Sequence, residues 1–144
     1  MNGVTVGEPG PVFRIMPLAG AVCAAFLALA APAMGAGPSL AMLDRLDAGN
    51  WEIRVREAGA QPQRMCLTSG YRLIQLRHPG PSCERVVVAA GANAVTVQYT
   101  CLGRGYGRTE IRRETNRLVQ IDTQGIADGK PFSQAIEARR TAGC

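Results

Sequence analysis

NAVTVQYTC, residues 93–101, places an apolar side chain at every second position from Val95 onward, with a polar side chain between. Successive side chains of a β-strand point to opposite faces, so this alternation predicts a strand with one buried and one exposed face. The expected buried set is Val95, Val97, Tyr99 and Cys101, and the expected exposed set is Thr96, Gln98 and Thr100.

Similar segments extend from this strand in both directions along the chain. Glycines, Asn116 and the pair Asp128-Gly129 separate them, and Asp-Gly is a strong hairpin signal. Connections this short join antiparallel strands. The sequence therefore predicts a mainly β fold, a six- to seven-stranded antiparallel meander that curls into a half-barrel. The expected strands are residues 51–57, 62–67, 84–90, 93–101, 106–115, 117–127 and 131–140.

Two further segments have helical character. Leu40, Leu43 and Leu46 recur every third residue, which predicts a short helical lead-in over residues 37–49, capped by Ser39. TSGYRLIQLRH, residues 68–78, predicts one short interior helix, capped by Thr68 and ended before Pro79. The sheet is expected to curl over this helix.

The N-terminal region resembles an export signal. Residues 18–31 are uncharged, Arg14 precedes them, and small residues follow. These features predict a signal peptide over residues 1–36, although a membrane anchor is the alternative. The remaining chain is then a lead-in, residues 37–49, and a β domain, residues 50–144. The expected location is the periplasm of a Gram-negative bacterium.

The cysteines suggest a disulfide framework. Cleavage of the signal removes Cys23 and leaves an even set, which in a small exported chain predicts two disulfides. Three pairings are open, and the favoured one is Cys66–Cys83 with Cys101–Cys144. The second pair would tie down the last strand, which is expected at an edge of the sheet. Metal binding is not expected, because close Cys-x-x-Cys pairs are missing from residues 66–144.

The net charge and the aromatic content limit the classes of partner that can be expected. The formal net charge is +5, and Lys130 is the only lysine. A basic surface can attract anionic lipid, glycan or nucleic acid, although it can also serve solubility alone. Trp51, Tyr99 and Phe132 lie on apolar faces and are expected in the core, so nucleic acid is not an expected partner.

A catalytic set is not evident. His78, the only histidine, lies in a proline-rich loop and is expected to be a solvated or turn-bonding side chain. Glu110 and Glu114 are about 13 Å apart on one strand, too far for paired acid–base work, and are expected to pair with arginines across strands. Asp44 and Asp47 are expected on a helix surface. Gly103, Gly105 and Gly107 predict a hairpin turn and not a phosphate loop. No catalytic residue, cofactor or metal is therefore predicted.

Several of these residues together resemble a known family. Trp51, Cys66-Leu67, Cys83, the YTC sequence ending at Cys101 and the terminal EARRTAGC are similar to the short members of the domain of unknown function 3617 family. The resemblance covers roughly residues 43–144. It implies a small exported β-rich domain with no established activity, cofactor or partner.

The function expected from these observations is a non-enzymatic binding or envelope-interaction module, monomeric, with an envelope lipid or protein as partner. A barrel with an apolar cavity would favour a lipid-like ligand, and a filled interior would favour a surface interaction. One alternative is a hydrolase built around His78, which requires a deep pocket at that residue. Another is an exported inhibitor of a protease or lysozyme that presents the loop of residues 76–82.

Overall fold

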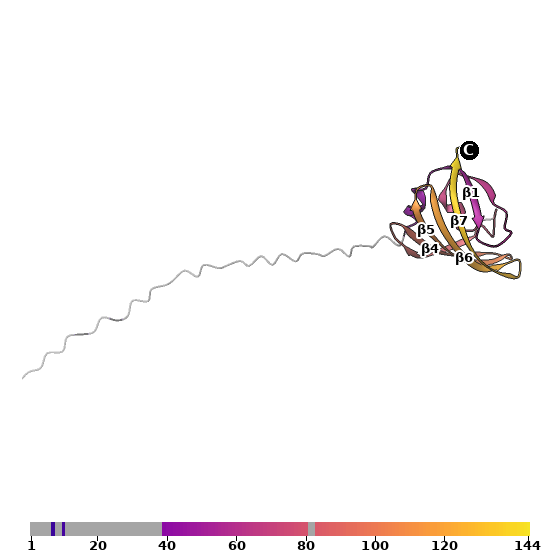
Figure 1. Ribbon diagram of the computed structural model, residues 1–144. Helices are drawn as coiled ribbons and strands as arrows, with labels where there is room; N and C mark the ends of the chain where they lie inside the picture. Colours follow the sequence, from indigo (N-terminus) through magenta and orange to yellow (C-terminus); the bar gives the residue numbers. More distant parts are fainter. Residues whose placement is uncertain (1–6, 8–9, 11–38, 81–82) are drawn as a thin grey trace, which may run out of the picture. The chain divides into compact units, whose positions relative to one another are not determined.

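The computed structural model describes residues 7, 10, 39–80 and 83–144. The expected signal peptide lies outside these residues, apart from Gly7 and Gly10. The described part forms one antiparallel sheet with two single-turn helices (Figure 1). The elements are α1 (Ala41–Asp44), β1 (Gly49–Val55), β2 (Gln63–Leu67), η1 (Gly70–Leu73), β3 (Glu84–Ala90), β4 (Ala94–Cys101), β5 (Gly105–Thr115), β6 (Leu118–Ala127) and β7 (Lys130–Ala142).

The strand prediction is confirmed, and the sheet stays open rather than closing into a barrel. Its order is β2-β1-β7-β6-β5-β4-β3. Strands β3 to β7 form the expected meander, but β1 then pairs antiparallel with β7. The last strand is therefore flanked on both sides, and the expectation that it lies at an edge is wrong. The edges are β2 and β3, because the first strand of the domain fills the place beside the last.

Both helical segments are shorter than expected. Residues 41–44 form one α-helical turn, and Leu40 rather than Ser39 takes the N-cap position, without a side-chain hydrogen bond. The interior segment forms a 3₁₀ turn, in which the Ser69 hydroxyl, not Thr68, accepts a hydrogen bond from the Tyr71 amide at 3.3 Å. No helix in the described ranges is long and apolar enough to cross a membrane.

Between β2 and β3, which are opposite edges of the sheet, residues 68–80 form a crossing segment that runs over the inner face. Leu73 and Ile74 of this crossing segment are buried among the strand residues, and Leu43 of α1 joins the same core. The indole of Trp51 is fully buried and donates a hydrogen bond to the Asp47 carbonyl at 3.0 Å. The interior of the half-barrel is thus filled by side chains. Its largest fully buried members are Trp51, Tyr99, Leu43, Leu67, Leu73, Ile74, Ile111 and Ile121.

Two disulfides form, but the favoured pairing is wrong. Cys66 bonds Cys144, and Cys83 bonds Cys101. The reason is the β1–β7 pairing: Asn50 lies opposite both Cys66 on β2 and Ala142 on β7, so the end of the chain arrives beside β2. The first disulfide links edge strand β2 to the chain just after β7, and the second links the residue before edge strand β3 to the last residue of β4. Each therefore opposes fraying of an edge of the sheet. Loops of 78 and 18 residues correspond to about 4.5 and about 3 kcal/mol of stabilisation.

Candidate functional site

The only histidine is buried, contrary to expectation. His78 has no exposed surface, because the crossing segment carries it under the turn between β4 and β5. Its Nε2 lies 3.1 Å from the Arg104 carbonyl oxygen, and its Nδ1 lies 3.2 Å from the Tyr99 hydroxyl. A carbonyl oxygen only accepts, so Nε2 donates to it, and in the neutral imidazole Nδ1 then accepts from the Tyr99 hydroxyl. Both ring nitrogens are therefore engaged.

Tyr99 continues this contact into a chain of buried hydroxyls. Burial raises its pKa above the ordinary value of 10.0, while the Thr123 hydroxyl and the charge of Arg77 oppose the rise. Thr123 Oγ1 lies 2.7 Å from Thr109 Oγ1, and Thr109 donates to the Ile74 carbonyl at 2.7 Å. The network ties the crossing segment to the sheet at both His78 and Ile74. Its groups satisfy one another, which is typical of a structural network.

The glycines of residues 103–107 are not all turn residues. The turn is residues 101–104, and Gly103 takes a positive φ of 73° there. Gly107 lies inside β5, opposite Tyr99. A Cβ at Gly107 would lie 2.4 Å from the Tyr99 hydroxyl oxygen. Glycine at this position therefore makes room for the tyrosine ring, and the interpretation of the whole stretch as a turn is wrong.

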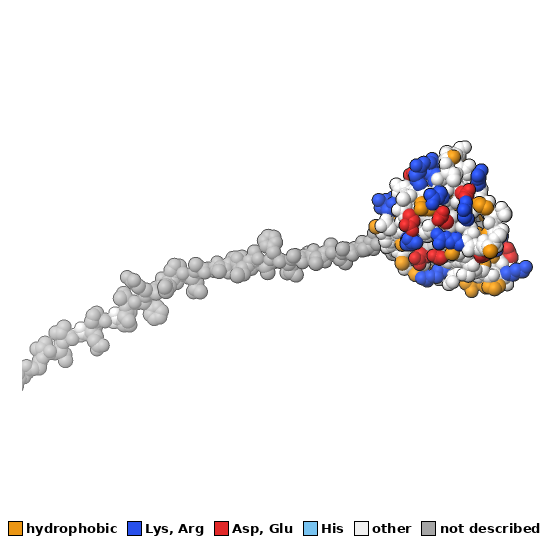
Figure 2. Space-filling view, in the orientation of Figure 1, with side chains coloured by type: hydrophobic (Ala, Val, Ile, Leu, Met, Phe, Trp, Pro, Cys, Tyr) orange, Lys and Arg blue, Asp and Glu red, His pale blue; other side chains and the backbone are white. Residues whose placement is uncertain are grey.

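The outer face of the sheet carries the charged side chains. Figure 2 shows Lys/Arg and Asp/Glu side chains intermingled over the middle of the face formed by β5, β6 and β7. In one part they pair with each other around Glu137. Its carboxylate lies 3.7 Å from Arg56 and 3.5 Å from Arg139, and Gln120 donates to it at 3.5 Å. We call Arg56, Gln120, Glu137 and Arg139 the paired cluster.

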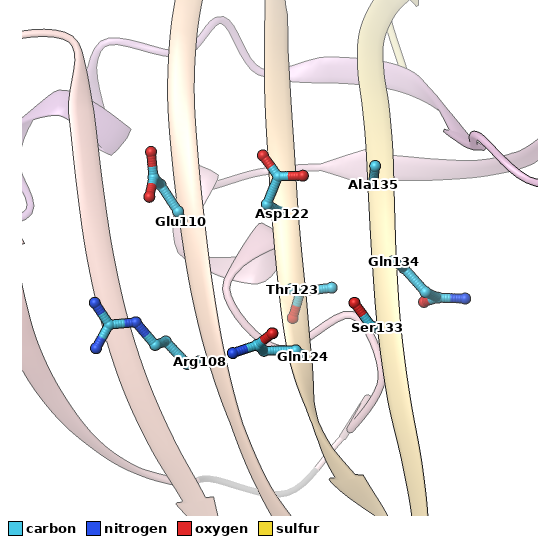
Figure 3. Close-up of a pocket in the computed structure, with 8 residues that line it drawn as sticks. All are labelled: Arg108, Glu110, Asp122, Thr123, Gln124, Ser133, Gln134 and Ala135. Carbon is cyan, nitrogen blue, oxygen red and sulfur yellow. The ribbon is translucent and has the colours of Figure 1, made fainter.

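Two adjoining hollows lie further along the same face, and we call them together the outer groove. One, of about 290 Å³, is shown in Figure 3, and the other has about 420 Å³. They share Arg108, Gln124 and Ser133. The short side chains of Ser133 and Ala135 on β7 leave the space open beside Asp122. The other polar or aromatic residues that line the groove are Gln98, Tyr106, Glu110, Thr123, Phe132 and Gln134.

The polar groups of the outer groove differ from those of the paired cluster. Within the described residues, no side-chain hydrogen bond or ion pair engages Gln98, Arg108 or Gln124, and the same holds for Glu110, Asp122 and Ser133. They point outward from neighbouring strands held in fixed register. Donors and acceptors that stand on strands in fixed register, around a hollow and without intramolecular partners, are available to bind a ligand.

Glu110 and Asp122 lie side by side, a pairing that the sequence reasoning missed. The turn pairs Thr115 with Leu118, and continuing that register would place Glu110 opposite Thr123. A bulge between Arg113 and Thr115 shifts the register by one and brings Glu110 opposite Asp122. The signal was present in the sequence, because Ile111 and Ile121 can share the buried face only after such a shift.

Of the remaining candidates, Glu114 and Asp47 lie apart from the groove, and Phe132 lines one end of it. Glu114 pairs with Arg112 of its own strand, so the expected cross-strand pairing is wrong. Asp47 lies 3.7 Å from Arg117. Phe132 is half-buried rather than in the core, and the Arg77 guanidinium lies 5.5 Å from its ring centre. In the described residues no group of three or more metal-ligating side chains gathers.

Comparison with known proteins adds no relative: no family model, no curated protein and no solved structure matches the chain.

Proposed function

We propose that this chain is a non-enzymatic binding module of the periplasm that holds an oligosaccharide in the outer groove. The observation that carries the proposal is the set of unpartnered polar side chains around two adjoining hollows. The filled interior supports a surface site, because the inner face holds core side chains where a lipid-like ligand would otherwise lie. The resemblance to the domain of unknown function 3617 family stays a prediction.

The chemistry of the lining favours a polyhydroxylated ligand. Arg108 only donates hydrogen bonds, Glu110 and Asp122 as carboxylates only accept them, and Gln98 and Gln124 do both. A hydroxyl group donates and accepts, so adjacent hydroxyls of one sugar chain can satisfy all of these groups. One guanidinium and two carboxylates leave little net charge, which suits an uncharged ligand. Tyr106, half exposed at one end of the groove, offers a ring face for stacking.

Export supports a glycan of the cell envelope as the ligand. Two disulfides persist in oxidising compartments, of which the bacterial periplasm is one. The expected signal peptide points the same way. Glycan strands of the envelope are the abundant polyhydroxylated polymers available to a small domain in that compartment.

The two alternatives have less support. A hydrolase built around His78 needs access to that side chain, which is buried with both ring nitrogens engaged. An inhibitor that presents residues 76–82 needs His78 on the surface of a protruding loop, whereas this residue is part of the interior.

Isothermal titration of the purified, disulfide-intact protein with N-acetylglucosamine oligomers tests the proposal. We expect weak binding, at micromolar to millimolar Kd, that Asp122→Asn and Arg108→Gln each weaken by about tenfold, the loss of one charged hydrogen bond. Arg112→Gln is the matched control, because Arg112 lies on the same strand and face but outside the groove. Absence of heat with these and with glucose oligomers, or equal losses in all three variants, would contradict the proposal.

A further inference from the structure

One end of the domain combines exposed apolar side chains with cations. The turn of residues 101–104, the hairpin turn of residues 127–130 and the end of the crossing segment at Arg77 meet there. The Asp128 amide donates to the Arg104 carbonyl at 2.9 Å, and His78 donates to the same oxygen. We call Arg77, Leu102, Arg104, Tyr106 and Lys130 the tip.

Leu102 is the most unusual residue of the tip. Its side chain is 100% exposed, at the summit of the turn between β4 and β5. Tyr106, on the strand that leaves this turn, is 50% exposed. The other large hydrophobic side chains that are exposed in the described residues, Val86 and Val88, belong to edge strand β3. Figure 2 shows hydrophobic side chains along the lower margin of the domain, near the β6–β7 hairpin.

The charges around Leu102 have one dominant sign. Arg77, Arg104 and Lys130 are cationic, and the carboxylate of Asp128 lies 3.6 Å from Arg104. Counted over Arg77, Arg104, Lys130 and Asp128 the net charge is about +2, and Glu84, which lies opposite Thr100 on the neighbouring strand, lowers it to about +1. An apolar summit at the same end of the domain as several cations is complementary to a bilayer with anionic headgroups, since the leucine can enter the interface while the cations stay at headgroup level.

The tip is also rigid, which lowers the entropic cost of docking. The disulfide Cys83–Cys101 closes the base of the turn that carries Leu102. The buried His78 fixes the turn from beneath through its bond to the Arg104 carbonyl. Because preorganised loops lose little freedom on binding, this arrangement gives the buried imidazole a positioning role.

We propose that the tip docks on the surface of an anionic lipid bilayer, with Leu102 inserted among the headgroups. The tip shares Tyr106 with the outer groove, but Leu102 and Lys130 do not line the groove, so substitutions at these two residues test docking separately from oligosaccharide binding. It holds the module at a membrane of the envelope. A single inserted leucine and three cations give weak, reversible and salt-sensitive binding.

Co-sedimentation with vesicles tests this docking. The full disulfide-intact protein is mixed with vesicles of phosphatidylcholine alone or of an equal mixture with phosphatidylglycerol. We expect binding to the mixed vesicles only, weakened about tenfold by Leu102→Ser and about fivefold by Lys130→Gln. Added salt should reduce it further.

Two control variants make the outcome specific to the tip. Val88→Ser removes an exposed apolar side chain from β3, and Arg45→Gln removes the same charge next to α1; both should bind like the wild type. Equal binding to neutral vesicles, no binding to either kind, or losses in the controls that match those of the tip variants would each overturn the proposal. A tip that instead contacts a protein would give the second of these results. Oligosaccharide titration of Leu102→Ser separates this test from that of the groove, because its affinity should be unchanged.

Discussion

The two faces of the sheet use polar side chains in opposite ways. On the inner face, His78, Tyr99, Thr109 and Thr123 satisfy one another and are closed off from solvent. On the outer groove, Arg108 and its neighbours have no partners in the described residues. Buried polar groups without partners are costly, whereas exposed ones are solvated, so only the outer face can keep free groups for a ligand. Substitutions on the inner face should therefore change stability, and those in the groove should change binding.

The largest loss of stability is expected from Trp51→Ala. Removing this fully buried indole leaves a cavity in the core and should lower the free energy of unfolding by about 3–5 kcal/mol. Denaturant unfolding followed by circular dichroism measures it, since Trp51 is the only tryptophan. Trp51→Phe, which loses the hydrogen bond to Asp47 but keeps a ring, should cost less. A loss below about 1 kcal/mol in Trp51→Ala would show that the inner face is not the core.

A smaller loss is expected from Gly107→Ala. The added methyl group would overlap the Tyr99 ring and should cost about 1–3 kcal/mol through overpacking. Gly91→Ala is the control, because its Cβ would meet only the Ala94 carbonyl oxygen, at 3.6 Å. Equal denaturation midpoints for the two variants would contradict the role given to Gly107.

Tyr99→Phe probes the hydroxyl network. It leaves Nδ1 of His78 without its donor, and we expect a loss of about 1–3 kcal/mol at neutral pH. The raised pKa of Tyr99 also predicts alkaline destabilisation. As the pH rises, the unfolded state loses the Tyr99 proton at a lower pH than the folded state does. The contribution of the neutral hydroxyl to the free energy of unfolding is therefore complete below pH 10 and falls as the pH rises above 10. Stability measured against pH should decline less steeply above pH 10 in Tyr99→Phe than in Tyr106→Phe, and identical slopes would count against this account.

The individual strands could be predicted from the sequence, whereas the pairing of strands far apart in the chain could not. Strands such as β4 were predicted because alternation is a local property of the chain. The β1–β7 pairing joins residues far apart in sequence, and no local pattern records it. The error in the Cys66 and Cys144 pairing follows from this, because only the β1–β7 pairing brings the end of the chain beside β2.

The site was predicted less well than the fold. The burial of His78 depends on where the crossing segment passes, which requires knowing that β2 and β3 lie at opposite edges. The Glu110–Asp122 pair depends on a bulge. The positions of Ile111 and Ile121 indicate that a one-residue shift is needed for both to face the core. The place of the bulge that makes this shift follows from the packing of the whole hairpin.

The smallest effects on stability are expected on the outer face, and there the two regions should separate. Asp122→Asn should change the free energy of unfolding by less than about 0.5 kcal/mol and still weaken oligosaccharide binding. Glu137→Gln, in the paired cluster, should lower stability by up to about 1 kcal/mol and leave binding unchanged. Thermal unfolding and titration of both variants measure this contrast. If Glu137→Gln weakened oligosaccharide binding and Asp122→Asn did not, the ligand would bind at the paired cluster and not in the outer groove.

The most direct test of the central claim is an amide NMR map of the disulfide-intact protein during titration with N-acetylglucosamine oligomers. We predict that the largest shift changes fall on Gln98, Arg108, Gln124 and Ser133, which four different strands bring together. Changes centred on the paired cluster or on β2, or a spectrum that does not change at saturating oligomer, would contradict a glycan site in the outer groove.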